Sequence, residues 1–168
     1  MLKDDLILKM MEFDAGDPKR IQHFMKVYEF AHLIGVKEGL GAHTLYILDL
    51  AAILHDIGIH PAEEKYGRCD GKLQEQEGPA YAGQLLGSFP EVEAPDVERI
   101  CYLIAHHHTY TDVDGMDYRI LLEADFLVNA FEDNLSKEAI ESFGNKVFKT
   151  GTGKSLLRTL YGVETAQA

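Results

Sequence analysis

The chain has 168 residues, 46% of them hydrophobic, and its 16 basic and 28 acidic side chains give a formal net charge of −12. This length fits one domain with one core, which the hydrophobic content can fill without disulfides. The acidic balance argues against nucleic acid as a main partner, because phosphate contacts need a basic patch.

The first half of the chain has helical periodicity. Asp17 is a suitable N-cap for a helix with Pro18 at its first position, and Gly35 is expected to end that helix. In the apolar run that follows, the Ala51-Ala52 pair and the length of the run favour helix over strand. The helices expected in this half cover residues 3–13, 18–34 and 44–56.

The second half begins with the polar, glycine-containing segment 60–77, which we expect to form a surface loop. Pro79 is expected to open a short helix, Asp96 to cap the next one, and Ser136 to cap a later helix that Gly144 interrupts. The helices expected between these caps cover residues 79–86, 97–107 and 118–132. Strand signals are nearly absent, so the predicted fold class is all-α.

One apolar run ends in a pair of ionisable residues. Within residues 45–54 only Asp49 is charged at neutral pH, and His55 and Asp56 follow directly. An imidazole and a carboxylate at the end of a buried element are costly to bury unless something pairs with them. A divalent metal is the natural partner, because it binds both ligand types.

Two more polar residues lie where helices would place apolar ones. His23 shares a helical face with three apolar residues, and Asp125 shares one with four. A hydrogen-bonded core histidine is the alternative for His23, and a salt bridge with Arg119 or Lys146 is the alternative for Asp125. Together with the His55–Asp56 pair, they form a mixed nitrogen and oxygen set. Such a set suits manganese, iron, nickel, zinc, cobalt or magnesium, and leaves positions on the ion for water and substrate.

The order His23…His55-Asp56…Asp125 resembles the HD-domain superfamily of metal-dependent phosphohydrolases. The segments around these residues match as well, and the resemblance covers about residues 18–132. It implies that the four residues hold the metal. It also implies a compact bundle of five or more helices with a central metal site. We therefore expect a single HD domain over residues 1–168, with 133–168 as a C-terminal helical extension.

Some relatives in this superfamily carry extra histidines for a second metal. His107 continues an apolar helical line and should face inward, although a solvated helix end is an equal alternative. The bimetallic relatives have another histidine before the helix that corresponds to residues 79–86. This chain has none there, and Glu77 is the candidate substitute, unless it is a solvated loop acid.

Two basic residues are candidates for substrate binding. Arg20 lies one helical turn before His23, where it would reach a substrate phosphate or form a surface salt bridge. Residues 149–155 resemble a phosphate-binding P-loop, but Phe148 stands at the first-glycine position, so we reject that assignment. A glycine-rich loop that carries Lys154 over the site to a phosphate remains a hypothesis.

The expected activity is hydrolysis of a small phosphorylated metabolite, with a nucleotide among the candidates, by a metal-activated water. His55 and Asp56 are the expected catalytic residues, and Asp56 would also orient the water. Two alternatives stay open: a di-iron oxygenase of the same fold, and a non-catalytic binding or signalling module. One redox-silent or manganese-like ion would favour hydrolysis.

The cysteines and the apolar segments indicate the compartment. Cys69 and Cys101 are isolated and lack a C-x-x-C spacing, so we expect the reducing cytoplasm. The N-terminus lacks the order of a signal peptide, and the run 45–54 is too short to cross a bilayer. We expect a cytoplasmic protein without a membrane partner. A homodimer stays open, because small helical domains often dimerise.

Overall fold

The computed structural model describes residues 2–165, and this part of the chain forms α-helices without any strand. The predicted all-α class is therefore confirmed. In chain order the helices are α1 (Leu2–Phe13), α2 (Pro18–Lys37), α3 (Ala42–Leu54), α4 (Ile59–Tyr66), α5 (Gly71–Leu86), α6 (Ala94–Ile104), α7 (Met116–Glu132), α8 (Lys137–Val147) and α9 (Gly151–Tyr161).

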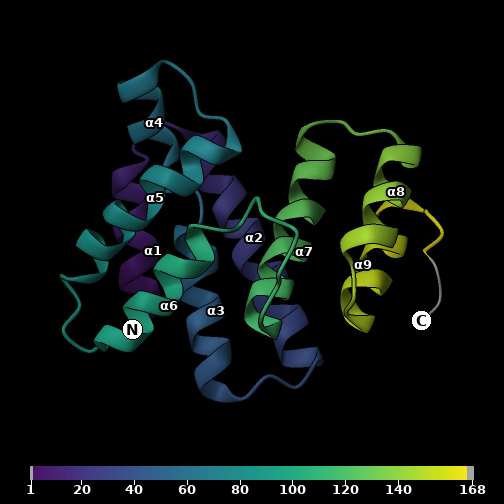
Figure 1. Cartoon of the computed structure of the whole chain (residues 1–168), viewed down its shortest axis with the longest axis horizontal. Helices are drawn as coiled ribbons and strands as arrows, with labels where there is room; N and C mark the ends of the chain where they lie inside the picture. Colours follow the sequence, from purple (N-terminus) through teal and green to yellow (C-terminus); the bar gives the residue numbers. More distant parts are fainter. Residues whose placement is uncertain (1, 166–168) are drawn as a thin grey trace.

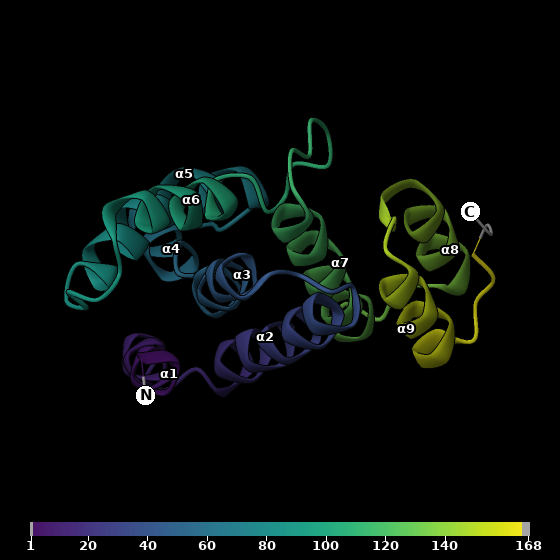
Figure 2. The ribbon, with the colours of Figure 1, turned by 90° about the horizontal axis from the view of Figure 1, so that it is seen from below.

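Helix α3 occupies the middle of the bundle and packs against α1, α2, α6 and α7 (Figure 1). Helices α4, α5 and α6 lie on one side of it, and α8 and α9 form a pair beyond α7 on the other side (Figure 2). The N-terminal helix and the C-terminal pair therefore lie at opposite ends of the long axis (Figure 1). The convergence of α2, α3 and α7 positions the site.

The burial of α3 explains its apolar composition. Every residue from Ile47 to Leu54 is buried, Asp49 included, because other helices surround this one. By length and composition alone, the stretch Ala42–Tyr66 could cross a membrane, but 67% of its most apolar window is buried within the protein. A core helix of a soluble protein has the same pattern. Asp49 accepts hydrogen bonds from Lys3 of α1 and His32 of α2, which links both helices to α3.

The segment 60–77 is helical rather than the expected surface loop. Helix α4 ends at Gly67, whose φ of 67° suits a glycine. Asp70 then caps α5 by accepting a hydrogen bond from the backbone N–H of Leu73. Pro79 lies inside α5 instead of opening a helix. The prediction of a loop was wrong because both helices bury only a narrow apolar face, so the composition of the segment is polar although it is largely helical.

Other boundaries differ where a glycine allows close packing. Gly35 does not end α2, which continues to Lys37. The glycine is needed for packing instead: a Cβ there would lie 2.7 Å from Leu45 Cδ1, so its absence lets α3 approach α2. Gly144 lies within α8 and makes room for Leu157 of α9 in the same way. The predicted cap Asp96 lies in the first turn of α6, whose N-cap position is Glu93. The predicted caps Asp17 and Ser136 are confirmed, since each accepts the expected backbone hydrogen bond.

Candidate metal centre

Four side chains from three distant segments meet in the middle of the molecule. His23 comes from α2, Asp125 from α7, and His55 and Asp56 from the turn that follows α3. His23 Nε2 lies 3.2 Å from His55 Nε2, 3.2 Å from Asp125 Oδ1 and 3.3 Å from Asp56 Oδ2. His55 Nε2 lies 3.5 Å from the same two carboxylate oxygens. The structure therefore brings the four predicted ligands together.

The local backbone fixes which nitrogen of the histidines faces this cluster. His55 Nδ1 donates to the carbonyl oxygen of Ala52 at 2.8 Å, and His107 Nδ1 donates to that of Ile104 at 2.7 Å. Because Nδ1 carries the proton in these bonds, Nε2 is left with its lone pair toward the carboxylates. Both rings thus present a nitrogen that can bind a metal.

Charge and burial act against each other in the cluster. Burial alone would raise the pKa of Asp125, but the hydrogen bonds and charges of His23 and His55 hold it well below its usual range. Burial would likewise raise the pKa of Asp56, and the charge of His55 together with the nearby His107 ring lowers it. Burial lowers the pKa of His23, but the hydrogen bond with Asp125 and the charge of Asp56 raise it to about 9. The two carboxylates are therefore ionised and favour positive charge beside them.

One buried atom indicates that the cluster fits a cation. His107 Nε2 is buried and has no hydrogen-bond partner among the described residues, although it lies 3.4 Å from Asp56 Oδ1. Ligand atoms of His23, His55 and Asp56 lie within 4.8 Å of one another. An inward-facing nitrogen without a partner, beside ionised carboxylates and further imidazoles, is the donor set that a divalent ion takes. The residues present therefore fit the implied metal.

A second group of candidate ligands shares Asp56. Ligand atoms of Asp56, His107 and His108 also lie within 4.8 Å of one another. The sequence predicted His107 from a helix that was expected to continue to residue 107, and it did not predict His108. Helix α6 ends at Ile104, and the turn after it directs both histidines inward. Burial lowers the pKa of His108 to about 4, so this ring is neutral.

Glu77 is not brought to this second group, contrary to the expectation. Its carboxylate accepts hydrogen bonds from the Tyr66 hydroxyl at 2.7 Å and from Lys65 Nζ at 3.1 Å. These partners are at the end of α4, so Glu77 links α4 to α5. Its position in a helix that packs on α4 could not be inferred while the segment was expected to be a loop.

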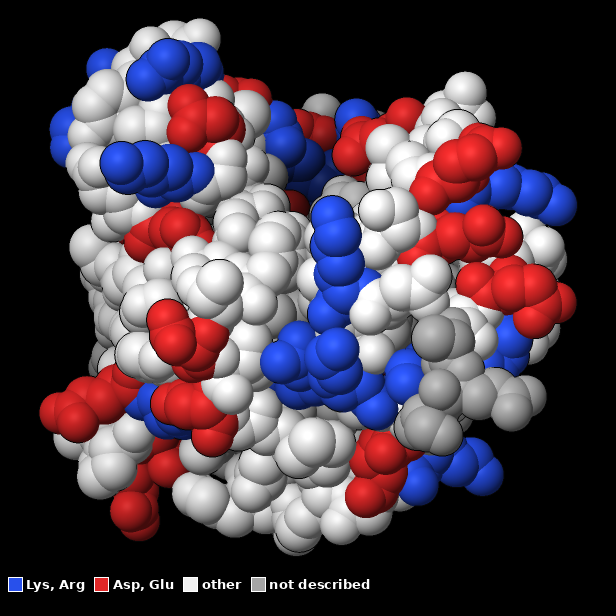
Figure 3. All heavy atoms as spheres, turned by 45° about the vertical axis from the view of Figure 1, so that its right-hand side comes forward, with Lys and Arg blue, Asp and Glu red and all other residues white. Residues whose placement is uncertain are grey.

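A polar cavity of about 160 Å³ opens above the cluster. It lies between the N-terminal turns of α2, the C-terminal turn of α7 and the start of α5, and its rim includes Lys19, Arg20, Gln74, His108, Asn129 and Asp133. Figure 3 shows a hollow at the top of the molecule, with basic and acidic side chains in its depth. An ion held by the cluster would thus be accessible to a small polar molecule.

The two basic residues predicted to bind substrate have different positions. Arg20 lines the cavity, and its guanidinium lies 2.6 Å from Glu63 Oε1 and 3.2 Å from Asp17 Oδ2. Lys154 is not brought to the cavity, because the glycine-rich segment is the first turn of α9 and not a free loop.

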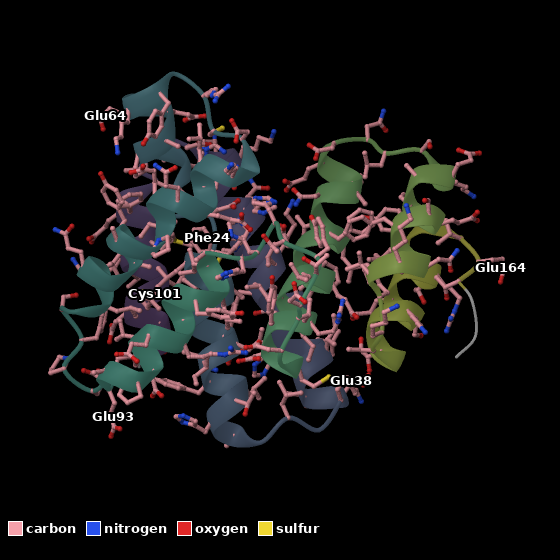
Figure 4. The ribbon with its side chains drawn as sticks, viewed as in Figure 1. Phe24, Glu38, Glu64, Glu93, Cys101 and Glu164 are labelled. Carbon is pink, nitrogen blue, oxygen red and sulfur yellow. The ribbon has the colours of Figure 1, made fainter. Side chains whose placement is uncertain are left out.

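Carboxylates of the chain itself occupy the amides of that segment. Glu123 accepts from the backbone N–H groups of Lys149 and Thr150, and Glu38 accepts from that of Thr152 at 2.7 Å. Figure 4 shows Glu38 at the end of α2, directed toward α9. These bonds anchor α9 to α2 and α7, and no residue of the segment is among those that line the cavity.

Comparison with known protein families gives one result. A family model described as HD domain matches residues 20–140 of the chain, a range that includes all four clustered residues. Comparisons with curated proteins and with solved structures give no match.

Proposed function

The chain belongs to the HD-domain family, and we propose that it is a metal-dependent phosphohydrolase that acts on a small phosphorylated metabolite. HD domains are typical of metal-dependent hydrolases. The observation that carries the proposal is the convergence of His23, His55, Asp56 and Asp125 below an open polar cavity.

The four clustered residues would hold the ion, for which manganese is our first candidate. A bound divalent ion lowers the pKa of its water from ~15.7 toward ~7 and polarises a phosphoryl oxygen. Asp56 is the member of the set that lines the cavity with His23, so its carboxylate would accept a hydrogen bond from the attacking water and orient it. The neutral imidazoles keep the site less negative than four carboxylates would, which favours an anionic substrate.

The first turn of α2 would attract the phosphate. Lys19 and Arg20 both line the cavity. Arg20 already pairs with two carboxylates, whereas Lys19 makes no ion pair within residues 2–165 and its exposed ammonium group is free to contact a substrate. We therefore assign the phosphate contact to Lys19 together with Arg20.

The second candidate ligand group supports one alternative. If Asp56, His107 and His108 also bound an ion, the site would hold two metals, as a di-iron oxygenase of the same fold requires. Metal analysis of the purified protein separates the proposals. One manganese-like ion supports hydrolysis, two irons support oxygenation, and a protein without any ion supports a binding or signalling module.

The direct test is phosphate release from p-nitrophenyl phosphate and a panel of phosphorylated metabolites, with manganese, magnesium, nickel or cobalt. We expect metal-dependent turnover, and we expect His55→Ala to lose metal binding and turnover together. His43→Ala is the matched control, because the His43 side chain is 70% exposed and contacts Asp96 and the Tyr46 ring, neither of which belongs to the cluster. Turnover that survives in the metal-free His55→Ala variant would refute the mechanism.

A further inference from the structure

Glu132, the last residue of α7, connects two residues that lie one turn apart on α2. Its Oε2 lies 2.8 Å from His23 Nδ1, and its Oε1 accepts from Lys26 Nζ at 2.6 Å. The Glu132 side chain is only 11% exposed. The carboxylate is therefore held at both oxygens, at the junction of the two helices that supply His23 and Asp125.

His23 differs from the other inward-facing histidines in the partner of its Nδ1 atom. His55 and His107 donate from Nδ1 to backbone carbonyls of their own turns, so the local fold fixes those rings. His23 lies inside a helix whose carbonyls are used by the helix itself, and the partner of its Nδ1 is a side chain from another helix. On its Nδ1 side, the orientation of this ring thus depends on the Glu132 carboxylate.

We propose that Glu132 is a positioning residue that orients His23 for the metal. This inference rests on the proposed function, since it assigns a role at the same site. With Nδ1 donating its proton to Glu132, the Nε2 atom of His23 points toward Asp56 and Asp125, and an incoming ion would replace the proton that Nε2 shares with these carboxylates. A carboxylate partner also makes the imidazole a stronger donor than a carbonyl partner does.

Lys26 completes the arrangement. Its ammonium group offsets the charge of Glu132 and holds Oε1, the carboxylate oxygen that His23 does not contact. The chain therefore orders Glu132 before any ion binds, so that His23 needs no reorientation when the ion arrives.

The test is the affinity for Mn²⁺, measured by titration calorimetry on the full chain. Loss of an outer partner of a metal-bound histidine costs about 10–100-fold in affinity, and we expect that loss for Glu132→Ala. Glu132→Gln keeps an acceptor for Nδ1 without the charge, so its loss should be smaller. Glu29→Ala is the matched control on α2, because Glu29 is exposed and does not line the cavity; its affinity should equal that of the unmodified chain.

Thermal unfolding of each metal-free variant separates positioning from stability. The proposal is supported if Glu132→Ala binds Mn²⁺ weakly while its unfolding temperature is retained. It is overturned if this variant binds as tightly as the unmodified chain. If Glu132→Ala does not fold, Glu132→Gln decides in the same way. If the unmodified chain binds no Mn²⁺, the proposed function fails. If the unmodified chain and Glu132→Ala bind Mn²⁺ equally well, only the role of Glu132 is refuted.

Discussion

The buried acids of this protein are of two kinds at the residue scale. Asp49 and Glu123 have their oxygens occupied by partners from the protein, a lysine and a histidine in one case and backbone amides in the other. Asp56 and Asp125 instead share the imidazoles of His23 and His55, and Asp125 Oδ1 also accepts a hydrogen bond from Asn129. A buried charge without full compensation is costly, so only the second kind gains from a bound cation. This contrast separates structural acids from candidate ligands.

Asp14 gives a residue-scale prediction for the dependence of stability on pH. Its side chain is buried near His60, and burial raises its pKa to about 6 from 3.8. Folding therefore favours the protonated form. The contribution of protonated Asp14 to the free energy of unfolding is complete below about pH 3.8 and is lost as the pH rises through about 6. We expect Asp14→Asn, which is neutral at every pH, to raise the free energy of unfolding by about 2 kcal/mol at pH 8 and by much less at pH 4.

Urea unfolding in the presence of EDTA at both pH values measures this difference. Asp5→Asn makes the same chemical change at an exposed position of α1. It should show no comparable gain at pH 8, since it only weakens a favourable charge at the helix N-terminus by a few tenths of a kcal/mol. An Asp14→Asn variant that is less stable than the parent at pH 8 would contradict the prediction.

His23 and Asp125 could be predicted because each is ionisable at a position where helical periodicity calls for an apolar side chain, and His55 and Asp56 because they end a buried apolar run. His108 could not be found in this way, because α6 ends before it and the turn changes the direction of the side chains. Arg20 forms the salt bridges that were one alternative for it and also lines the cavity, while its contact with a substrate phosphate stays a prediction. Lys19, its exposed neighbour on the rim, carries no pattern in the sequence that distinguishes it from other lysines.

A close contact between two backbones is the main constraint at the scale of elements. Gly58 ends the turn that holds His55 and Asp56, and α5 passes directly over it. A Cβ at Gly58 would lie 2.6 Å from the carbonyl oxygen of Gln74 and 2.7 Å from the nitrogen of Gly78. Since both are backbone atoms, they cannot rotate away. The glycine thus sets the distance between α5 and the candidate metal centre.

We therefore expect Gly58→Ala to lower the free energy of unfolding by about 1–3 kcal/mol, the usual range for an added group in a tightly packed place. Mn²⁺ affinity should fall with it, because the displaced turn carries two candidate ligands. Urea unfolding and titration calorimetry measure the two effects.

Gly83→Ala on α5 is the control for this substitution. The nearest atom to its Cβ would be Cys101 Sγ at 3.8 Å, an ordinary contact. Alanine in a helix interior is favoured over glycine by about 1 kcal/mol, so this variant should be slightly more stable. If both substitutions had the same effect, the close approach at Gly58 would not be the cause.

The long helices were predictable as elements, whereas their limits were not. The periodicity of α2, α3 and α7 follows from broad buried faces, and the caps Asp17 and Ser136 are local signals. Gly35 and Gly144 suggested helix breaks, but each only removes a side chain where another helix approaches. That approach is a property of packing, which no local pattern contains.

At the scale of the whole molecule, the cluster joins segments that the sequence separates widely. Helices α2, α3 and α7 meet there, and each packs against the other two. The similarity to HD domains anticipated this convergence, but the placement of α8 and α9 against α7 was not predicted. The single-domain organisation, the cytoplasmic location and the homodimer remain predictions.

Because the cluster joins three helices, an ion bound there should stabilise the entire fold. A ligand at 100 times its dissociation constant contributes about 2.7 kcal/mol. In a domain of this size, 1 kcal/mol corresponds to about 2–4 °C in the unfolding temperature. We expect saturating Mn²⁺ to raise the unfolding temperature by about 5–10 °C and EDTA to reverse the rise, as calorimetry or circular dichroism would record. Asp125→Asn should abolish most of this shift, because it removes a candidate ligand from α7 while it keeps the shape of the side chain. An equal shift in the variant would mean that the stabilising ion binds elsewhere and that the central cluster does not hold the three helices together through a metal.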